Sequence, residues 1–142
     1  MKDIMLKIVG KQIVGDSQEE DQIEFVTEGK LYEKNDATYL MYEETEVSGM
    51  PGCKTSLKIK EDMIRMKRYG EGMGADTVME FQKGYRFEGF YDTPFGPIEM
   101  EVLTNDIVNT LTSDGEGCIN IDYNISLKGL SEGRSKLSIQ II

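Results

Sequence analysis

The chain has 142 residues, a net charge of −10 and an apolar fraction of 39%. This length fits one domain spanning residues 1–142, and no apolar run approaches the roughly 20 residues that a membrane-spanning helix requires. Histidine is absent, which removes the commonest general base and the commonest metal ligand. The acidic balance disfavours nucleic acid as a partner. We expect a cytoplasmic location, because the N-terminal residues lack the pattern of a signal peptide.

Alternation of apolar and polar residues is the dominant pattern, and turn residues interrupt it at near-regular spacing. The first such run covers about Ile4 to Ile13. In the second run, from Ile23 to Leu31, every other side chain lies on one face. Asn35-Asp36 then turns the chain into a third run, from Thr38 to Glu44. No window shows a convincing helical period. The pattern predicts little helix and mostly antiparallel strand.

The register of the next hairpin follows from its side chains. With Glu61-Asp62 as a two-residue turn, Ile59 faces Ile64 and Leu57 faces Met66, so the apolar residues coincide on one side. The same register sets Thr55 opposite Arg68 on that side. The other side of the hairpin then carries two further cross-strand pairs, Lys58 with Arg65 and Ser56 with Lys67. The register therefore predicts that Arg68 points inward.

A second hairpin is predicted around Gln82-Lys83-Gly84, with Gly84 in the left-handed conformation. It would pair Phe81 with Tyr85 and Met79 with Phe87. After it, the segment from Tyr91 to Gly96 forms a tight turn in which Pro94 presets the backbone.

The remaining runs complete an all-β chain. Ile98 to Val102 alternate, Asn105-Asp106 is expected to turn the chain into Ile107 to Thr112, and Ile119 to Leu127 form the clearest strand before the final run at Leu137 to Ile141. So many strands in so short a chain favour closure, and we predict a single antiparallel barrel of about 8–10 strands.

The chain also resembles a known family. The residues that carry the resemblance are Tyr39-Leu40, Tyr42-Glu43-Glu44, Thr55, Leu57, Arg68-Tyr69-Gly70, Glu80-Phe81, Tyr91-Asp92-Thr93-Pro94-Phe95-Gly96, Thr104 and Tyr123. Their order and spacing, from roughly Thr38 to Ile139, are similar to those of the YwiB-like family of uncharacterised bacterial proteins. The resemblance implies a calycin-like, that is lipocalin-like, barrel and no established activity.

Catalysis is not expected. Without histidine, Ser-His-Asp, Cys-His and imidazole-zinc chemistry are excluded. Candidate carboxylate pairs are Glu43/Glu44, Glu99/Glu101 and Asp114/Glu116. Glu99 and Glu101 are more simply explained as solvated side chains, and Asp114 and Glu116 lack the number of ligands that a calcium loop supplies. Cys53 and Cys118 form no zinc motif and are expected to be buried. We expect no cofactor and no metal site.

Binding of a small amphipathic or apolar ligand inside the barrel is the leading hypothesis. Met41, Met66, Met79 and Met100 are expected to point inward, and so are Tyr39, Tyr42, Tyr85, Tyr91 and Tyr123. These residues would either fill the interior or adapt to a ligand. Arg68 needs a carboxylate, from Glu80 or one of Glu43 and Glu44, or an anionic ligand, unless its charged end extends to the barrel rim. The candidate ligand-binding residues are Tyr42, Glu44, Arg68, Glu80, Tyr91, Thr93 and Tyr123, although the turn at Tyr91 to Gly96 also has a purely structural interpretation.

The alternative hypothesis is a docking module on the outside of the same hairpin. One face is predicted to carry five cations, which would meet an acidic protein segment or a phosphate-bearing partner: Lys54, Lys58, Lys60, Arg65 and Lys67. The structural alternative is that a neighbouring strand with Glu44 and Glu46 neutralises them. No exposed aromatic platform is expected beside these charges.

Overall fold

The computed structural model describes residues 2–15, 19–45, 52–70, 76–93, 95–112 and 114–142. All regular structure in these residues is β-strand, and ten strands form one antiparallel sheet in the order β6-β5-β4-β3-β2-β1-β10-β9-β8-β7. The strands are β1 (Lys2–Val14), β2 (Asp21–Lys34), β3 (Ala37–Glu43), β4 (Lys54–Lys60), β5 (Met63–Tyr69), β6 (Val78–Gln82), β7 (Arg86–Thr93), β8 (Gly96–Asn109), β9 (Cys118–Leu127) and β10 (Ser131–Ile141). The described residues include no helix that could cross a membrane.

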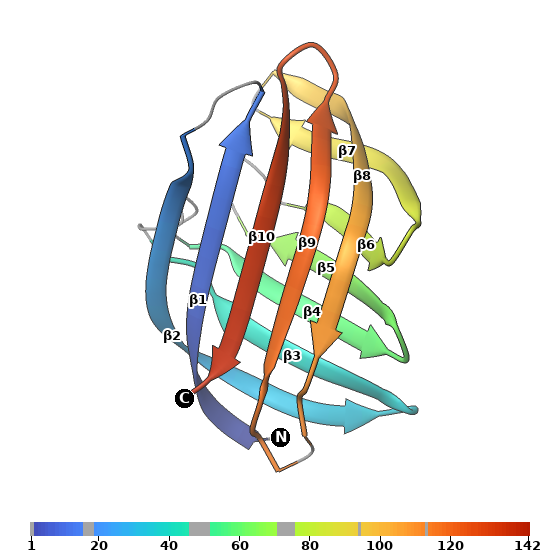
Figure 1. The fold of residues 1–142 in the computed structure, drawn as a ribbon. Helices are drawn as coiled ribbons and strands as arrows, with labels where there is room; N and C mark the ends of the chain where they lie inside the picture. The colour runs from blue at the N-terminus through green and yellow to red at the C-terminus, as the bar shows by residue number, and fades with distance from the viewer. Residues whose placement is uncertain (1, 16–18, 46–51, 71–75, 94, 113) are drawn as a thin grey trace.

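The sheet curls into a nearly closed barrel. In Figure 1 the long strands β1, β10, β9 and β8 form one wall, and β3, β4, β5 and β6 cross behind them at a steep angle. The two ends of the sheet, β6 and β7, are joined by a turn in which the Gly84 amide donates to the Thr104 carbonyl at 3.0 Å. Side chains also bridge the ends, because the Phe81 ring of β6 lies 4.8 Å from the Tyr123 ring of β9. The predicted all-β barrel is confirmed.

Aligned rows of apolar side chains fill the interior. The register of β2 to β6 places Leu31, Leu40, Leu57, Met66 and Met79 directly beside one another. All five are buried, and they belong to one core cluster with residues of β1, β8, β9 and β10. Alternation of apolar and polar residues in each strand produces these rows, because successive side chains point to opposite faces of a sheet.

The β4–β5 hairpin has the predicted register at each of the five pairs. Its turn residue Glu61 has a φ of 56°, and the turn of β2 into β3 has Asn35 and Asp36 at 53° and 64°. These left-handed conformations suit the right-handed twist of two-residue hairpins. The buried faces of both hairpins therefore follow from turn geometry and apolar alternation together.

The hairpin predicted between β6 and β7 is wrong. Gly84 has the expected positive φ of 77°, but β6 pairs only with β5, and β7 pairs only with β8. Beyond the turn, Tyr85 accepts a backbone hydrogen bond from Thr104 of β8. The apolar patch expected from the hairpin is therefore divided: Met79 and Phe81 are buried, whereas Tyr85 is exposed.

The expected turn at Asn105-Asp106 is also wrong, because β8 continues through it. The register shifts between Thr104 and Asp106, so Asn105 is the extra residue of a β-bulge. Its side-chain amide donates to Asn124 at 2.6 Å. This polar pairing across β8 and β9 explains why two turn-forming residues occur within a continuous strand.

Several side chains point elsewhere than predicted. Register places Tyr39 and Met41 on the outer face, beside Lys58 and Ser56, rather than inside. Cys53 is buried as expected, but Cys118 is only half-buried, and the described residues contain no disulfide bond. Met66, Met79 and Met100 are buried in the core as predicted.

Candidate functional site

A polar row lies inside the barrel, one step along the strands from the apolar row. Register aligns Tyr42 of β3, Thr55 of β4 and Arg68 of β5. The row continues to Thr77, just before β6, whose carbonyl accepts from the Arg68 amide at 2.9 Å. We call Tyr42, Thr55, Arg68 and Thr77 the interior polar row.

Glu44 is the acidic partner of this row. The Thr55 hydroxyl donates to Glu44 Oε1 at 2.6 Å, and Arg68 Nε lies 3.9 Å from the same oxygen. The expectation that Glu44 meets Arg68 is confirmed. Arg68 Nε and Glu44 Oε1 are too far apart for a hydrogen bond. Arg68 Nε and Thr77 Oγ1 are both buried without a hydrogen-bond partner in the described residues.

Tyr42 of the row and the nearby Tyr123 have raised pKa values. Burial raises the pKa of Tyr42, and the nearby Glu44 carboxylate raises it further. Burial likewise raises the pKa of Tyr123, although Arg68 acts in the opposite direction. Both phenols are therefore hydrogen-bonding groups, not bases, at neutral pH.

The other candidate ligand-binding residues do not join this row. Glu80 was expected near Arg68, but register places it opposite Arg65 on the outer face. The Thr93 hydroxyl donates to the Gly96 carbonyl at 2.6 Å and accepts from the Phe95 amide at 3.2 Å, so it closes its own turn. Tyr91 packs partly buried against the core. The preset backbone expected of Pro94 lies outside the described residues.

The outer surface of β4 and β5 carries the predicted cations. Lys54, Lys58, Lys60, Arg65 and Lys67 are all exposed, and we call them the basic face. None of the five forms an ion pair within the described part of the chain. Glu44 cannot neutralise the basic face because it points inward, and Glu46 lies outside the described residues. Two acidic residues of the described chain lie directly across the strands from this face: Glu43 opposite Lys54, and Glu80 opposite Arg65.

Tyrosines line this face, contrary to expectation. Tyr32 and Tyr39 are cross-strand neighbours whose rings stack, with their centres 4.9 Å apart and their planes 5° from parallel. Lys58 Nζ lies 5.9 Å from the centre of the Tyr39 ring. Register continues this line of residues through Lys58 and Arg65 to Glu80. The tyrosine pair was missed because Tyr39 was assigned to the interior; the outward alternation of Tyr32 was the available signal.

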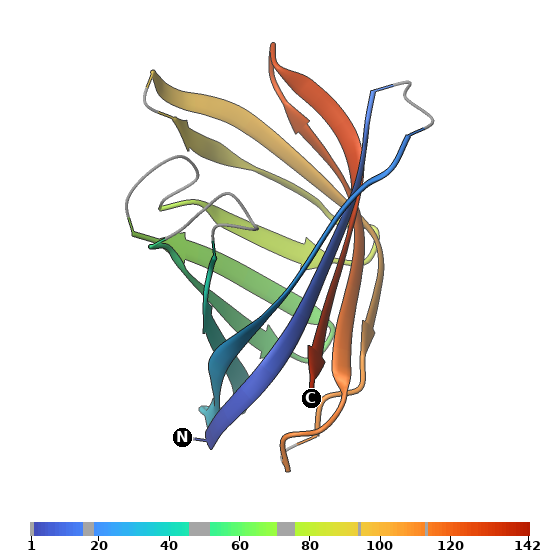
Figure 2. The same ribbon diagram turned by 90° about the vertical axis from the view of Figure 1, so that its left-hand side faces the viewer.

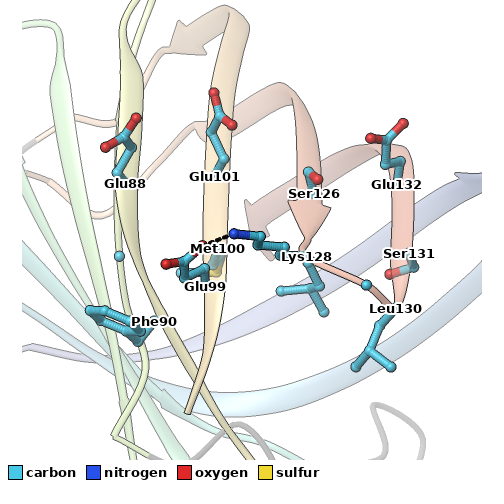
Figure 3. Close-up of a pocket in the computed structure, with 13 residues that line it drawn as sticks. Glu88, Phe90, Glu99, Met100, Glu101, Ser126, Lys128, Leu130, Ser131 and Glu132 are labelled. Carbon is cyan, nitrogen blue, oxygen red and sulfur yellow. Dashed lines mark ion pairs between the residues drawn. The ribbon is translucent and has the colours of Figure 1, made fainter.

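A groove of about 830 Å³ lies on the opposite part of the outer surface (Figure 3). Strand pairing aligns one residue from each of β7, β8, β9 and β10 across the groove: Glu88, Glu101, Ser126 and Glu132. Phe90 and Leu130 flank the groove and are highly exposed. Lys128 Nζ lies 3.1 Å from Glu99 there. The expected solvent-facing orientation of Glu99 and Glu101 is confirmed.

A second groove, of about 730 Å³, lies beside the two chain ends and includes Lys2, Met41 and Ile142 in its lining. Neither groove is lined by Arg68 or Thr77. Within the described residues, no group of three or more acidic or cysteine side chains is arranged to hold a metal ion.

Comparison with known proteins identifies the family. The model of the domain of unknown function DUF1934 matches residues 6–139. The uncharacterized beta-barrel protein YwiB of Bacillus subtilis (strain 168) is 27% identical over 129 residues, which cover 91% of this chain and 87% of that protein. The crystal structure of ywiB protein from Bacillus subtilis superposes with a TM-score of 0.73 at 22% identity, covering 99% and 93% of the two chains. The YwiB-like resemblance is therefore confirmed, and the chain belongs to the DUF1934 family of β-barrel proteins, whose function is unknown.

Proposed function

We propose that this protein is a docking module that binds an acidic protein segment on its basic face. The supporting observation is that five exposed cations lie together without an ion-pair partner among the described residues, in a chain of net charge −10. Like charges placed opposite each other, as Lys58 and Arg65 are, destabilise a sheet. An acidic partner would relieve this repulsion. The proposal assigns no reaction to the chain.

The tyrosines favour a protein partner over nucleic acid. Bases bind to sheets by stacking on free aromatic faces, but the Tyr39 ring already has Tyr32 against one side and Lys58 nearby. The hydroxyls and ammonium groups of this surface are donors, and they suit carboxylates. The acidic remainder of the chain also repels a long polyanion.

The experiment uses a fluorescein-labelled peptide of alternating glutamate and valine as the probe, and fluorescence anisotropy measures its affinity. We expect the double variant Lys58→Glu/Arg65→Glu to weaken binding by about tenfold or more, since each lost charge contact contributes on the order of 1 kcal/mol. Raising the salt concentration should weaken binding to the unaltered protein, because exposed charges are screened.

A matched control is available on another face. Lys11 and Lys136 are also cross-strand neighbours with like charge, on β1 and β10. Lys11→Glu/Lys136→Glu changes the net charge equally, so it should leave most of the affinity intact. Equal loss in both double variants, or tighter binding of a single-stranded oligonucleotide than of the peptide, would overturn the proposal.

Ligand binding at the interior polar row is the second candidate. It is supported by two buried polar atoms of this row, Arg68 Nε and Thr77 Oγ1, which have no hydrogen-bond partner among the described residues. Native mass spectrometry of protein purified from its own host would reveal a retained small anion, and Arg68→Met should abolish its retention. If the unaltered protein retains no small molecule, this candidate is excluded and the docking proposal is unaffected.

A further inference from the structure

Among the described residues, the sheet has two unpaired edges, and one of them borders the basic face. Strands β6 and β7 end the strand order, and neither pairs with the other. Figure 2 shows β7 and β8 leaning away from β6, so the two edges diverge from the turn that joins them. The β6 edge lies directly beside β5, which carries Arg65 and Lys67.

The direction of the β6 backbone can be derived from its pairing. The Arg68 amide donates to the Thr77 carbonyl, so Thr77, Met79 and Phe81 direct their backbone groups toward β5, in the alternation of an antiparallel ladder. Val78 and Glu80 therefore direct their N–H and C=O groups away from β5. No backbone hydrogen bond to these two residues is found in the described part of the chain.

An unpaired edge of this kind is a template for another strand. Natural edges are usually protected by proline, by lysine or by shortness. Strand β6, with the sequence VMEFQ, has neither proline nor lysine, and its protections are its length of 5 residues and the single charge of Glu80. The side chains of Met79 and Phe81 on its inner face are buried, and those of Val78 and Glu80 face outward.

We infer that the acidic partner binds as an extended strand added antiparallel to β6, with alternate acidic and apolar side chains. This inference rests on the proposed docking function. Directly opposite residues of an antiparallel pair share one face, so residues that bond Val78 and Glu80 point outward. The backbone of the added strand lies two strand spacings, about 10 Å, from the backbone of β5. The outward-pointing residues of the partner are therefore within reach of the long cationic side chains of β5. Residues of the other parity face the interior beside Met79.

Glu80 is an unfavourable neighbour for such a partner. It lies between the added strand and Arg65, so Glu80→Gln should tighten binding of the glutamate–valine probe. Glu80→Pro removes the same charge and also removes the backbone N–H of residue 80. Because this N–H faces the free edge, its loss leaves the hydrogen bonds between β5 and β6 intact. We expect Glu80→Pro to bind up to roughly tenfold more weakly than Glu80→Gln, because one backbone hydrogen bond to the added strand is lost.

Backbone methylation of the probe tests the geometry without altering the protein. In the inferred register the glutamate amides donate to Val78 and Glu80, whereas the valine amides face away. N-methylation of the glutamates should therefore abolish binding, and N-methylation of the valines should preserve it. Hydrogen exchange of the unaltered protein should also show that the Val78 and Glu80 amides become protected when the probe binds.

The outcomes separate this inference from the proposed function. Equal binding of the two methylated probes, with no new protection at Val78 and Glu80, would overturn strand addition. If Lys58→Glu/Arg65→Glu still weakens binding in that case, docking on the basic face stands without strand addition. Loss of the charge dependence would instead overturn the proposed function itself.

Discussion

At the scale of single residues, the buried phenol of Tyr42 links stability to pH. Its pKa is raised above the ordinary value of 10.0 by burial and by Glu44. Above a pH of about 10 the unfolded chain loses a proton that the folded chain keeps, so the free energy of unfolding falls as pH rises. Below that pH the stabilising contribution is fully present.

Tyr42→Phe should make this alkaline decline shallower, because the variant has no proton to lose at this position. It should also cost about 1 kcal/mol at neutral pH, because the hydrogen bond between the Tyr42 hydroxyl and the Thr55 side chain is lost. Urea denaturation at a series of pH values measures both effects. A decline as steep as in the unaltered protein would show that Tyr42 is not the group responsible.

At the scale of elements, the connection between β8 and β9 depends on one glycine. Gly117 has a φ of +105°, and a Cβ there would lie 2.2 Å from the Thr110 carbonyl oxygen. Because the Thr110 carbonyl belongs to the backbone, no side-chain rotation can relieve this contact. Gly117→Ala should therefore destabilise the protein by more than about 1–3 kcal/mol, the usual cost of strained backbone alone.

Gly84 provides the control for that prediction. It also has a positive φ, of +77°, but a Cβ there meets nothing within 4 Å. Gly84→Ala should cost only the conformational penalty, about 1 kcal/mol. Thermal denaturation of the two variants compares them directly, and equal losses would contradict a steric role for Gly117.

Elements whose signals agree were predictable from the sequence. In β4 and β5 the turn residues, the apolar alternation and the charge pattern all specify one register, and that register is observed. At Gly84 and Asn105 only the turn signal was available. A left-handed glycine reverses the chain without determining which strand it joins, and Asn105 forms a bulge because its amide has a partner on β9.

The candidate residues followed the same rule. Arg68 and the basic face were placed correctly because they belong to the well-determined hairpin. Glu80 and Tyr39 were placed on the wrong face, since one residue of register moves a side chain across the sheet. The free edge at β6 could not be predicted, because it depends on which strands close the barrel.

At the scale of the whole molecule, side chains rather than a hydrogen-bonded ladder complete the barrel. Phe81 comes from one end of the sheet, is fully buried and packs on Tyr123 of β9, two strands from the other end. Beyond the turn at Gly84, no ladder joins β6 and β7 in the described residues. The packing of this ring should therefore carry much of the energy that keeps the two walls together.

Phe81→Ala should cost about 3–5 kcal/mol, as expected for a buried phenylalanine whose removal leaves a cavity. Phe90→Ala on β7 is the matched control, because that ring is 61% exposed and its loss should stay within about 0.5 kcal/mol. Urea denaturation followed by tyrosine fluorescence gives both values. The amides of β6 should also exchange faster in Phe81→Ala than those of β1, since β6 would lose its contact across the gap while β1 keeps a paired strand on each side. Similar costs for the two variants would mean that the barrel does not depend on this contact for its closure.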